Sequence, residues 1–326
     1  MRAVVLVGGE GTRLRPLTLT RPKQMLPVLG ETMLERVLRA LARHGITEAV
    51  LSLGYRPDAF LRAFPTGWAG GVRLRYAVED SPLDTAGAIR FAAWEAGYDE
   101  ERLVVVNGDI LTDLDIGALL RFHEERGAEA TLSLHQVDDP SAFGVVPTDS
   151  EGRVLEFVEK PERELAPTDW INAGTYVLEP AALARIPLRE RVSIERVTFP
   201  AIAAEGRLFG FKWNGQWVDA GTPESYRTSQ LGFLDGPAGR WCGPGTILSG
   251  GVVGSVVGGF GRIELGASVR DSVLLPRVTV GAMAQVSMSV LGEGVVVGEG
   301  ARIDDSVLGD GVVVAAGERL QGVRRP

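Results

Sequence analysis

The sequence predicts an α/β fold, in which a mixed sheet is flanked by helices, followed by a solenoid of short parallel strands. Three observations support this expectation. Apolar runs alternate with amphipathic stretches up to about residue 130. Strand-like runs then follow one another with few helices between them, and the tail repeats its apolar residues at a fixed period. Glycine also accumulates late, since 19 of 42 glycines fall in residues 239–326, so we place the domains at 1–236 and 237–326.

The first part is predicted to form strands that alternate with helices. The expected strands are 3–7, 49–53, 72–77 and 103–106, and the expected helices are 33–44, 57–64, 86–96 and 115–126. Alternation of this kind implies right-handed crossovers and a mostly parallel sheet. Ligands bind such sheets beyond the carboxyl ends of the strands, so the loops 8–23, 79–87 and 107–112 are the informative ones.

The second part is predicted to extend this sheet and close the other side of the site. Its expected strands are 131–136, 144–147, 154–158, 171–178 and 208–213, and its expected helices are 193–205 and 223–234.

The tail contains an internal repeat. Apolar residues are separated by 6, 6, 5, 6, 5, 6, 6, 5 and 6 positions: Ile263, Val269, Leu275, Val280, Val286, Leu291, Val297, Ile303, Leu308 and Val314. The same phase returns every 17 residues. Glycines stand where corners are expected, at Gly266, Gly281, Gly292, Gly298 and Gly309. This spacing favours a three-sided coil of parallel strands over a sandwich or an unstructured tail.

Composition excludes several classes of protein. No apolar run approaches the roughly 20 residues of a membrane helix, and the N-terminal run reads as a strand, not a signal peptide. One cysteine, Cys242, excludes internal disulfides and fits a reducing cytoplasm. The net charge of −8 argues against non-specific nucleic-acid binding. We therefore expect a cytoplasmic protein without nucleic-acid or membrane partners.

The loop after the first strand has the composition of a phosphate site. Residues 8–14 read GGEGTRL, and glycines let backbone N–H groups approach a phosphate closely. Leu14 replaces the third glycine of a dinucleotide fingerprint, and no Gly-Lys-Ser/Thr follows as in a P-loop. Arg13 and Lys23 flank the turn, which suits a triphosphate. Lysine is scarce here, since only Lys23, Lys160 and Lys212 occur, and we assign no role to Lys212.

Two aspartates are candidates for a metal site. Asp109 ends a buried apolar strand, and Asp219 follows an apolar run and precedes a glycine turn. A carboxylate in such a place is costly unless it is solvated or meets a cation. Two carboxylates from separate strands can share one Mg²⁺, which takes phosphate and water oxygens as its other ligands. The alternative is that each aspartate caps a turn.

These residues together resemble a known family. Residues 8–23, Asn107-Gly108-Asp109, 157–161, Asn172-Ala173-Gly174 and 217–223 are similar to the motifs of sugar-1-phosphate nucleotidyltransferases, and the resemblance covers nearly all 326 residues. It implies a Rossmann-like mixed sheet flanked by helices (the nucleotide-diphospho-sugar transferase fold) and a C-terminal left-handed parallel β-helix of hexapeptide-like repeats. Within the family the pattern is nearest to the guanylyltransferases of mannose 1-phosphate, which make GDP-mannose.

The resemblance implies a role for each motif residue. The catalytic residues would be Arg13, Lys23, Asp109 and Asp219, of which Asp109 and Asp219 would bind Mg²⁺. The nucleotide would be bound by Leu6, Gly8, Gly9, Gly11, Thr12, Arg13, Lys23, Glu79, Pro82, Thr85, Gly87 and Asp109. The sugar phosphate would be bound by Gly144, Glu159, Lys160, Asn172 and Gly174. Without the resemblance, Glu159-Lys160 reads as a solvated charge pair and Asn172 as a turn cap.

The implied reaction needs no general base. An oxygen of the sugar phosphate attacks the α-phosphorus of the NTP in line, and pyrophosphate leaves. A phosphate monoester has its second pKa at about 6, so the nucleophile is already anionic at neutral pH. Catalysis then consists of alignment and charge neutralisation. This agrees with the scarcity of histidine, and we assign no role to His44, His123 or His135.

The base is expected to be guanine. Glu79 can accept the parallel N1–H and N2–H bonds that guanine offers, whereas uracil and thymine present one N–H beside a carbonyl that would repel a carboxylate. Asp84 departs from the family, which usually has glycine there, and this matters if the backbone needs a positive φ.

Three alternatives remain open. The first is the same chemistry on glucose 1-phosphate with dTTP or UTP. The second is a hexapeptide-repeat acyltransferase, which would use a histidine in the coils, but residues 239–326 contain neither His nor Lys. The third is a non-catalytic regulatory subunit, which would normally lose Arg13, Lys23 or an acidic metal ligand. The flat faces and end strands of the solenoid further predict a homo-oligomer.

Overall fold

The computed structural model describes residues 1–54 and 56–326. The chain forms two compact units. The first, here called the sheet unit, contains Met1–Gly9 and Leu34–Trp217. The second, here called the β-helix unit, contains Glu10–Met33 and Val218–Pro326. Most of the glycine-rich loop therefore belongs to the same unit as the C-terminal coils.

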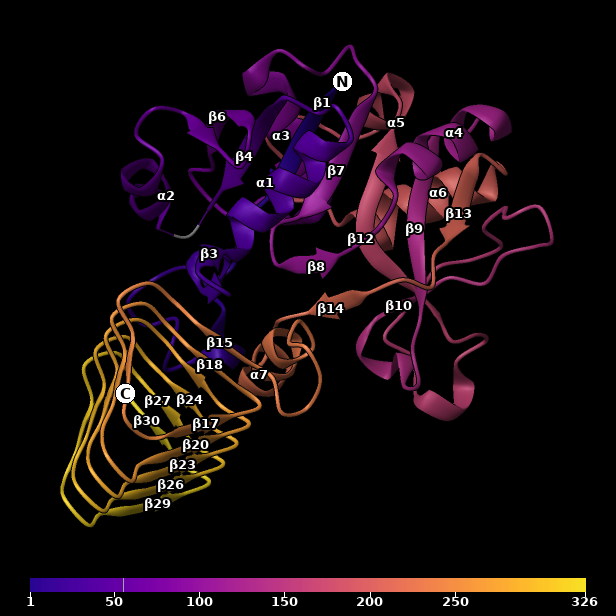
Figure 1. The fold of residues 1–326 in the computed structure, drawn as a ribbon. Helices are drawn as coiled ribbons and strands as arrows, with labels where there is room; N and C mark the ends of the chain where they lie inside the picture. The colour runs from indigo at the N-terminus through magenta and orange to yellow at the C-terminus, as the bar shows by residue number, and fades with distance from the viewer. Residues whose placement is uncertain (55) are drawn as a thin grey trace. The chain divides into compact units, whose positions relative to one another are not determined.

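The sheet unit contains a ten-stranded mixed sheet (Figure 1). Its parallel part has the order β7-β1-β4-β6, built from β1 (Arg2–Leu6), β4 (Glu48–Leu53), β6 (Val72–Val78) and β7 (Leu103–Asn107). The strand β12 (Trp170–Leu178) runs antiparallel to β7 and to β9 (Ala130–Gln136). The sheet is completed by β5 (Trp68–Ala69), β10 (Gly144–Val145), β11 (Val158–Glu159) and β13 (Leu208–Lys212).

The first four helices of the sheet unit follow the predicted alternation, and three shorter helical segments come later in the chain. They are α1 (Met33–Arg43), α2 (Pro57–Ala63), α3 (Asp84–Ala96), α4 (Ile116–Arg126), α5 (Pro180–Ala184), the π-helical turn η5 (Ile194–Thr198) and α6 (Phe199–Ala204). Helix α4 begins where the Asp115 carboxylate accepts a bond of 3.0 Å from the Ala118 N–H, which satisfies one of the free donors at a helix start. The apolar core includes Val4, Val105, Tyr176 and Phe199, all fully or almost fully buried.

Several expected elements differ in the structure. The expected strand 154–158 is wrong over most of its length, because only a bridge at Val154 and β11 at its far end are paired. Its partner β10 stops at Val145, and Leu155 is 62% exposed. The expected helix 193–205 is divided into η5 and α6, α3 begins two residues early, and α5 was not expected.

The β-helix unit contains three stacks of parallel strands (Figure 1). The first stack is β15 (Arg240–Cys242), β18 (Ser255–Val257), β21 (Val273–Leu274), β24 (Val290–Leu291), β27 (Val307–Leu308) and β30 (Arg324–Arg325). The second is β16 (Ile247–Leu248), β19 (Arg262–Ile263), β22 (Thr279–Val280), β25 (Val296–Val297) and β28 (Val313–Val314). The third is β17 (Gly251–Val253), β20 (Ser268–Arg270), β23 (Gln285–Ser287), β26 (Arg302–Asp304) and β29 (Arg319–Gln321).

The register confirms the 17-residue repeat. Ile263 pairs with Val280, Val280 with Val297, and Val297 with Val314, and all four are buried. This is the stack of parallel strands expected of the left-handed β-helix. The predicted series of inward apolar residues is wrong at one position, because Leu274 and not Leu275 lies opposite Leu291.

Further elements of this unit precede the coils. They are η1 (Thr12–Leu14), η2 (Lys23–Met25), the hairpin of β2 (Pro27–Val28) and β3 (Glu31–Thr32), and α7 (Pro223–Leu231). The short strand β8 (Ile110–Thr112) and the 3-10 turns η3 (Pro140–Ala142) and η4 (Arg163–Leu165) belong to the sheet unit, and the chain passes from the sheet unit to the β-helix unit within β14 (Trp217–Asp219). None of the helices formed by residues 1–54 and 56–326 combines the length and the apolar character needed to cross a bilayer.

Candidate active site

The glycine-rich loop folds back on itself within the β-helix unit. Gly11 has φ +60°, in the left-handed region that favours glycine. The Thr18 hydroxyl donates a bond of 2.8 Å to the Gly11 carbonyl. A Cβ atom at Gly11 would lie 3.1 Å from Thr18 Cγ2 and 3.3 Å from Lys23 Cβ, so only a glycine allows this closure without movement of a neighbour. The structure therefore brings Gly11 close to Lys23, and the role of this turn in binding phosphate stays a prediction.

Arg13 and Asp219 face one another in the same unit. Arg13 Nη2 lies 3.9 Å from Asp219 Oδ2, and the two side chains are 65% and 25% exposed. Gly221 allows this approach, because a Cβ atom there would lie 2.8 Å from Arg13 Nη2 and 2.9 Å from Asp219 Oδ1. The sequence identified Gly221 only as part of a motif, and its steric role becomes visible in three dimensions. A guanidinium and a carboxylate are thus held close enough to share an anionic ligand and its cation.

Asp109 occupies the carboxyl end of the parallel sheet. It follows β7 and is 9% exposed. The neighbouring Gly108 N–H donates a bond of 2.9 Å to the Leu6 carbonyl, which places the ends of β1 and β7 side by side. Gly8 and Gly9 follow from β1, and Gly9 has φ +96°. The sheet unit therefore presents a carboxylate beside a glycine turn.

The donor chemistry of the two aspartates fits a divalent cation of the Mg²⁺ type. Both offer hard carboxylate oxygens, and Mg²⁺ is commonly held by one or two carboxylates with phosphate and water oxygens as its remaining ligands. Across the described ranges 1–54 and 56–326, the structure holds no group of three or more His, Cys, Asp or Glu side chains placed to bind a metal.

The carboxylate of Glu79 is held by hydrogen bonds from β4 and from its own loop 79–87. Glu79 Oε1 accepts from the Ser52 hydroxyl at 3.0 Å, and Glu79 Oε2 accepts from the Leu83 N–H at 3.0 Å. These bonds fix the orientation of the carboxylate and leave each oxygen with a further lone pair. Asp84 has φ +61°, so the position does require the left-handed conformation that the family's glycine would adopt easily.

Two other residues of this loop have structural partners. The Thr85 hydroxyl donates to Glu195 Oε2 at 2.7 Å and accepts from the Ile194 N–H at 2.9 Å. A Cβ atom at Gly87 would lie 2.2 Å from the Glu190 carbonyl oxygen, so this glycine permits close packing of a neighbouring segment. Pro82 is exposed. A role in nucleotide binding remains a prediction for all three residues.

The expected sugar-phosphate residues meet at one edge of the sheet. Gly144 on β10 pairs with Glu159 on β11, and β10 also pairs with β12, which contains Asn172. Lys160 Nζ lies 3.2 Å from Glu159 Oε1, and the Lys160 side chain is 59% exposed. A Cβ atom at Gly144 would lie 2.6 Å from the Phe157 ring, so glycine keeps this edge open to Glu159.

Asn172 and Gly174 form a bulge in β12. The pairing with β9 shifts in register between Asn172 and Tyr176. Asn172 Oδ1 accepts from the Gly174 N–H at 3.1 Å, and Asn172 Nδ2 donates to the Tyr176 hydroxyl at 2.9 Å. Gly174 has φ +75°, and a Cβ atom there would lie 2.4 Å from Ile110 Cδ1. Bulges of this kind re-aim side chains at functional sites.

Aromatic residues to which the sequence assigns no role line the same region. The Trp217 indole N–H donates a bond of 3.0 Å to the Ala173 carbonyl, between Asn172 and Gly174. His135 stacks on Trp217 with ring centroids 5.4 Å apart, and Phe143 meets Trp217 edge-on at 5.5 Å. The sequence did not predict this contact, because His135 lies in an apolar strand pattern that gives no sign of stacking on Trp217.

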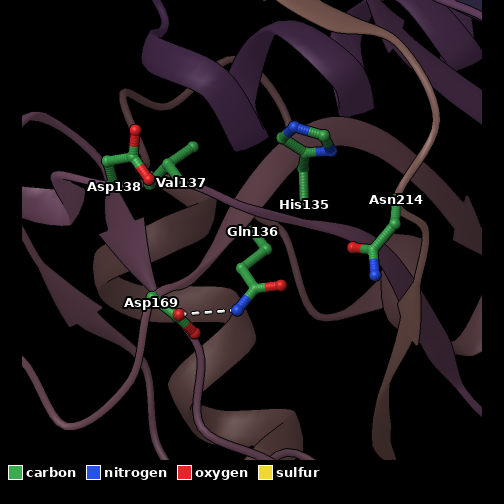
Figure 2. A pocket seen from close by; sticks show the side chains of 6 residues that line it. All are labelled: His135, Gln136, Val137, Asp138, Asp169 and Asn214. Atoms are coloured by element: carbon green, nitrogen blue, oxygen red, sulfur yellow. Dashed lines mark hydrogen bonds between the residues drawn. The ribbon is translucent and has the colours of Figure 1, made fainter.

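A hollow of about 450 Å³ opens beside His135 (Figure 2). It is lined by His135, Gln136, Val137, Asp138, Asp169 and Asn214. Gln136 Nε2 donates to Asp169 Oδ2 at 2.7 Å across its wall. Sequence reasoning assigned no role to any of these residues, because they come from the end of β9 and from loops without a motif.

Comparisons with known proteins identify the families that the two parts of the chain match. Residues 2–235 match the family described as nucleotidyl transferase, and residues 241–323 match the family described as GlmU-like, C-terminal hexapeptide. A mannose-1-phosphate guanylyltransferase of Mycobacterium tuberculosis is 40% identical over 304 residues, which cover 87% of this chain and 82% of that protein. A mannose-1-phosphate guanyltransferase of Aspergillus fumigatus is 40% identical over 245 residues, which cover 74% of this chain and 66% of that protein.

A solved structure has the same fold. The crystal structure of HddC from Yersinia pseudotuberculosis complexed with GMP-PN superposes with a TM-score of 0.61 at 28% sequence identity. The match covers 71% of this chain and 99% of that chain.

Proposed function

Since the chain belongs to the nucleotidyl transferase family, we propose that it transfers a guanylyl group from GTP to mannose 1-phosphate, giving GDP-mannose and pyrophosphate. The names of the relatives support the choice of substrates. The approach of Arg13 to Asp219 at 3.9 Å is the observation that supports the chemistry, because the cation proposed to neutralise phosphate lies beside a carboxylate proposed to bind the metal. The activity belongs to residues 1–236, and residues 237–326 form the β-helix; the two family matches support this division.

The nucleotide side of the reaction depends on charge neutralisation. Arg13 binds the triphosphate and offsets the negative charge that develops on the leaving pyrophosphate. Lys23 holds the phosphates as a compact point charge next to the Gly11 turn. Asp109 and Asp219 would hold Mg²⁺, which supplies further neutralisation of phosphate charge when it is bound.

The sugar side depends on hydroxyl and phosphate contacts. Glu159 accepts from two sugar hydroxyls, while the exposed ammonium of Lys160 binds the incoming phosphate. The spare donor and acceptor sites of Asn172, fixed by Tyr176 and Gly174, contact the ring. These groups hold the anionic nucleophile in line with the α-phosphorus.

The base is read by Glu79 in this proposal. Ser52 and Leu83 each occupy one lone pair of its carboxylate and thereby fix its direction. The remaining lone pairs accept the N1–H and N2–H of guanine. Each such charge-assisted bond contributes roughly 1.5–3 kcal/mol, so dTTP and UTP should be disfavoured tenfold or more.

A substrate panel tests the proposal. Purified protein with Mg²⁺ is incubated with GTP, dTTP or UTP and with mannose 1-phosphate or glucose 1-phosphate, and pyrophosphate release is measured. We expect GTP with mannose 1-phosphate to give a kcat/KM at least about tenfold above every other pair. Turnover of glucose 1-phosphate with dTTP but not GTP would refute the assignment of the base and establish the thymidylyltransferase alternative.

The three lysines provide matched variants for the same assay. Lys23→Ala should reduce kcat/KM about 100-fold, and Lys160→Ala should act mainly on the KM for the sugar phosphate. Lys212→Ala is the control, because Lys212 has no assigned role in the reaction. Its ammonium contacts an aromatic ring instead, with Nζ 5.0 Å from the centroid of Trp170. Equal kinetic constants for all three variants would refute the proposed contacts of Lys23 and Lys160 with phosphate.

We further propose that the protein is cytoplasmic and forms a homo-oligomer through the β-helix or the catalytic domain. The outer rows of the β-helix expose Ile247, Val296 and Val313 at 52%, 42% and 66%, which supports association through a flat face. A single monomeric species in light scattering across working concentrations would refute this assembly.

A further inference from the structure

Two acidic side chains of the β-helix hold an arginine of segment 10–33. Arg21 Nη2 lies 2.6 Å from Glu293 Oε2 and 2.6 Å from Asp310 Oδ2. The three side chains are 23%, 19% and 16% exposed, so the group is largely withdrawn from water. Burial alone would lower the pKa of Arg21, but the hydrogen bond to Glu293 and the charge of Asp310 outweigh it and raise that pKa. We call these three residues the Arg21 clamp.

Neighbouring bonds fix the geometry of the Arg21 clamp. The Thr20 hydroxyl donates to Asp310 Oδ2 at 2.5 Å, and the Glu293 N–H donates to Asp310 Oδ1 at 2.7 Å. Arg277 forms a second ion pair with Glu293. Asp310 is therefore fully engaged, and both acids are oriented before they meet Arg21.

The acids are a departure from the coil repeat. Glu293 and Asp310 are 17 residues apart and so occupy the same position in successive coils. The equivalent positions in the two preceding coils are Gly259 and Pro276. A corner position that is otherwise uncharged becomes acidic only in the coils that meet Arg21.

The chain that follows Lys23 is also anchored within the β-helix unit. The Tyr226 hydroxyl donates to the Pro27 carbonyl, and the Leu29 N–H donates to Gln230 Oε1 at 3.2 Å. Lys23 thus lies between two anchored points, at Arg21 and Pro27. Its neighbour Gln24 is 1% exposed, which leaves little freedom for the chain between these anchors.

We propose that Glu293 and Asp310 are positioning residues for the nucleotide, because through Arg21 they hold Lys23 and the Gly11 turn in the conformation that receives the triphosphate. This inference rests on the proposed function. It assigns the β-helix a direct effect on nucleotide affinity, in addition to any role in assembly.

The expected effect follows from chain entropy. Fixing the backbone of a residue costs conformational entropy, and a loop that is ordered in advance does not incur that cost when the nucleotide binds. Removal of the clamp transfers part of this cost to the binding step. The KM for GTP should therefore rise while the KM for mannose 1-phosphate, whose contacts lie in the sheet unit, should stay near that of the wild type.

Paired variants measure the coupling. Arg21→Ala and the double variant Glu293→Gln/Asp310→Asn should each raise the KM for GTP about tenfold. The variant with all three substitutions should have a KM no more than about twofold above that of either, because all of them remove the same interaction. Arg21→Lys should restore part of the loss. Arg277→Gln is the matched control, since it removes the other cation on Glu293 and leaves segment 10–33 in place.

Two readouts separate this inference from a loss of folding or of the proposed function. Hydrogen exchange should increase in peptides from residues 11–26 of the double variant and stay unchanged in the coils 241–287. The dissociation constant of Mg·GTP, measured by calorimetry, should rise with the KM. A wild-type protein that binds GTP but transfers no guanylyl group would refute the proposed function alone, and calorimetry on the variants would still decide the coupling. A double variant whose GTP affinity and KM stay within about twofold of the wild type would overturn the inference.

Discussion

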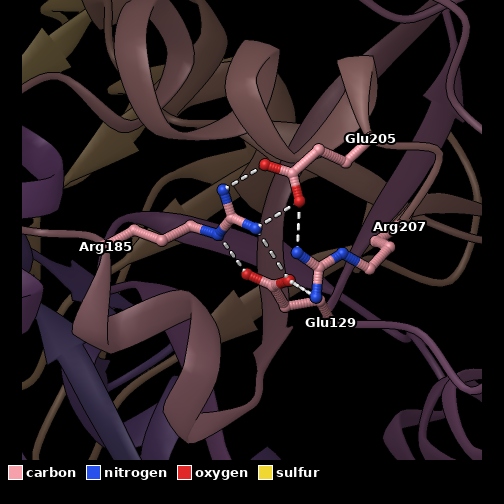
Figure 3. Close-up of polar contacts among 4 residues, drawn as sticks. All are labelled: Glu129, Arg185, Glu205 and Arg207. Carbon is pink, nitrogen blue, oxygen red and sulfur yellow. Dashed lines mark hydrogen bonds and ion pairs between the residues drawn. The ribbon is translucent and has the colours of Figure 1, made fainter.

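The two units bury polar groups in opposite ways. The sheet unit concentrates charge in one network, in which Glu129, with a side chain only 3% exposed, accepts from Arg185 at 2.5 Å and from Arg207 at 2.8 Å (Figure 3). Glu205 pairs with both arginines on the exposed side of this network. The network joins the start of β9, the end of α5 and the start of β13, which have no sequence relationship to one another.

The β-helix unit distributes its buried polarity along a ladder of identical residues. Ser255, Ser272, Ser289 and Ser306 are buried and 17 residues apart. Each hydroxyl donates to the carbonyl two residues before it and accepts the N–H of the next coil, as between Ser255 Oγ and the Ser272 N–H at 3.1 Å. A unique network therefore makes stability depend on a few residues, whereas a repeated contact divides the same dependence among many residues.

The largest expected effect comes from breaking the unique network. Glu129→Gln removes a buried charge that serves two arginines, and loss of one partner of a buried pair costs about 3–5 kcal/mol. Segmental hydrogen exchange should show this loss in the sheet unit, with the β-helix coils unchanged. Glu205→Gln is the control, because it removes a 45% exposed partner of the same arginines. A similar loss for both variants would contradict a dominant role for the buried carboxylate.

A smaller effect is expected from the serine ladder. Ser289→Ala leaves the Ser306 N–H without its acceptor and should cost about 1–3 kcal/mol. Ser272→Ala should lower the free energy of unfolding by the same amount within about 0.5 kcal/mol, because Ser272 has the same surroundings as Ser289 one coil later. Ser268→Ala, in the half-buried outer row of β20, should be nearly neutral. Chemical denaturation with a probe in the coils measures all three, and unequal costs for Ser272 and Ser289 would show that the coils are not equivalent.

The smallest effect concerns acid stability and sharpens the same contrast. Hydrogen bonds from Arg185 and then Arg207 lower the pKa of Glu205 from 4.5 to about 2. A carboxylate with a depressed folded-state pKa stabilises the fold above its unfolded pKa and loses that contribution as the pH falls from 4.5 toward 2. The free energy of unfolding of the sheet unit should therefore fall in this window, and Glu205→Gln should weaken its dependence on pH. Urea titrations at several pH values provide the measurement; an unchanged pH dependence in Glu205→Gln would contradict the prediction.

The sequence predicts the regular parts of the molecule well because they follow a period. The 17-residue spacing identified the inward residues of the coils, which are buried, with the single shift from Leu275 to Leu274. Gly281, Gly292 and Gly298 prove to be required by the next coil, because a Cβ atom at each would lie 2.5 to 2.8 Å from its backbone. The serine ladder was missed, since a serine in a strand is ordinarily expected to face water.

The irregular parts resist prediction because tertiary contacts decide them. Residues 154–158 alternate like a strand, but β10 is too short to pair with them. Motif and residue type predict roles for Arg13, Asp219 and Lys160, and those roles stay predictions. The steric need for Gly221 and the stacking of His135 on Trp217 could not be predicted, because they depend on residues far apart in the chain. Membership of segment 10–33 in the β-helix unit also has no local signal.

The position of Glu293 and Asp310 in the stack limits how this architecture can change. Deleting one coil before Glu293 would move both acids by one strand spacing, about 4.8 Å, and would separate them from Arg21. Coils added after Asp310 would leave the pair undisturbed. Related chains can therefore lengthen at the distal end at little cost, while the count of coils between α7 and the acids should stay constant wherever Arg21 is retained.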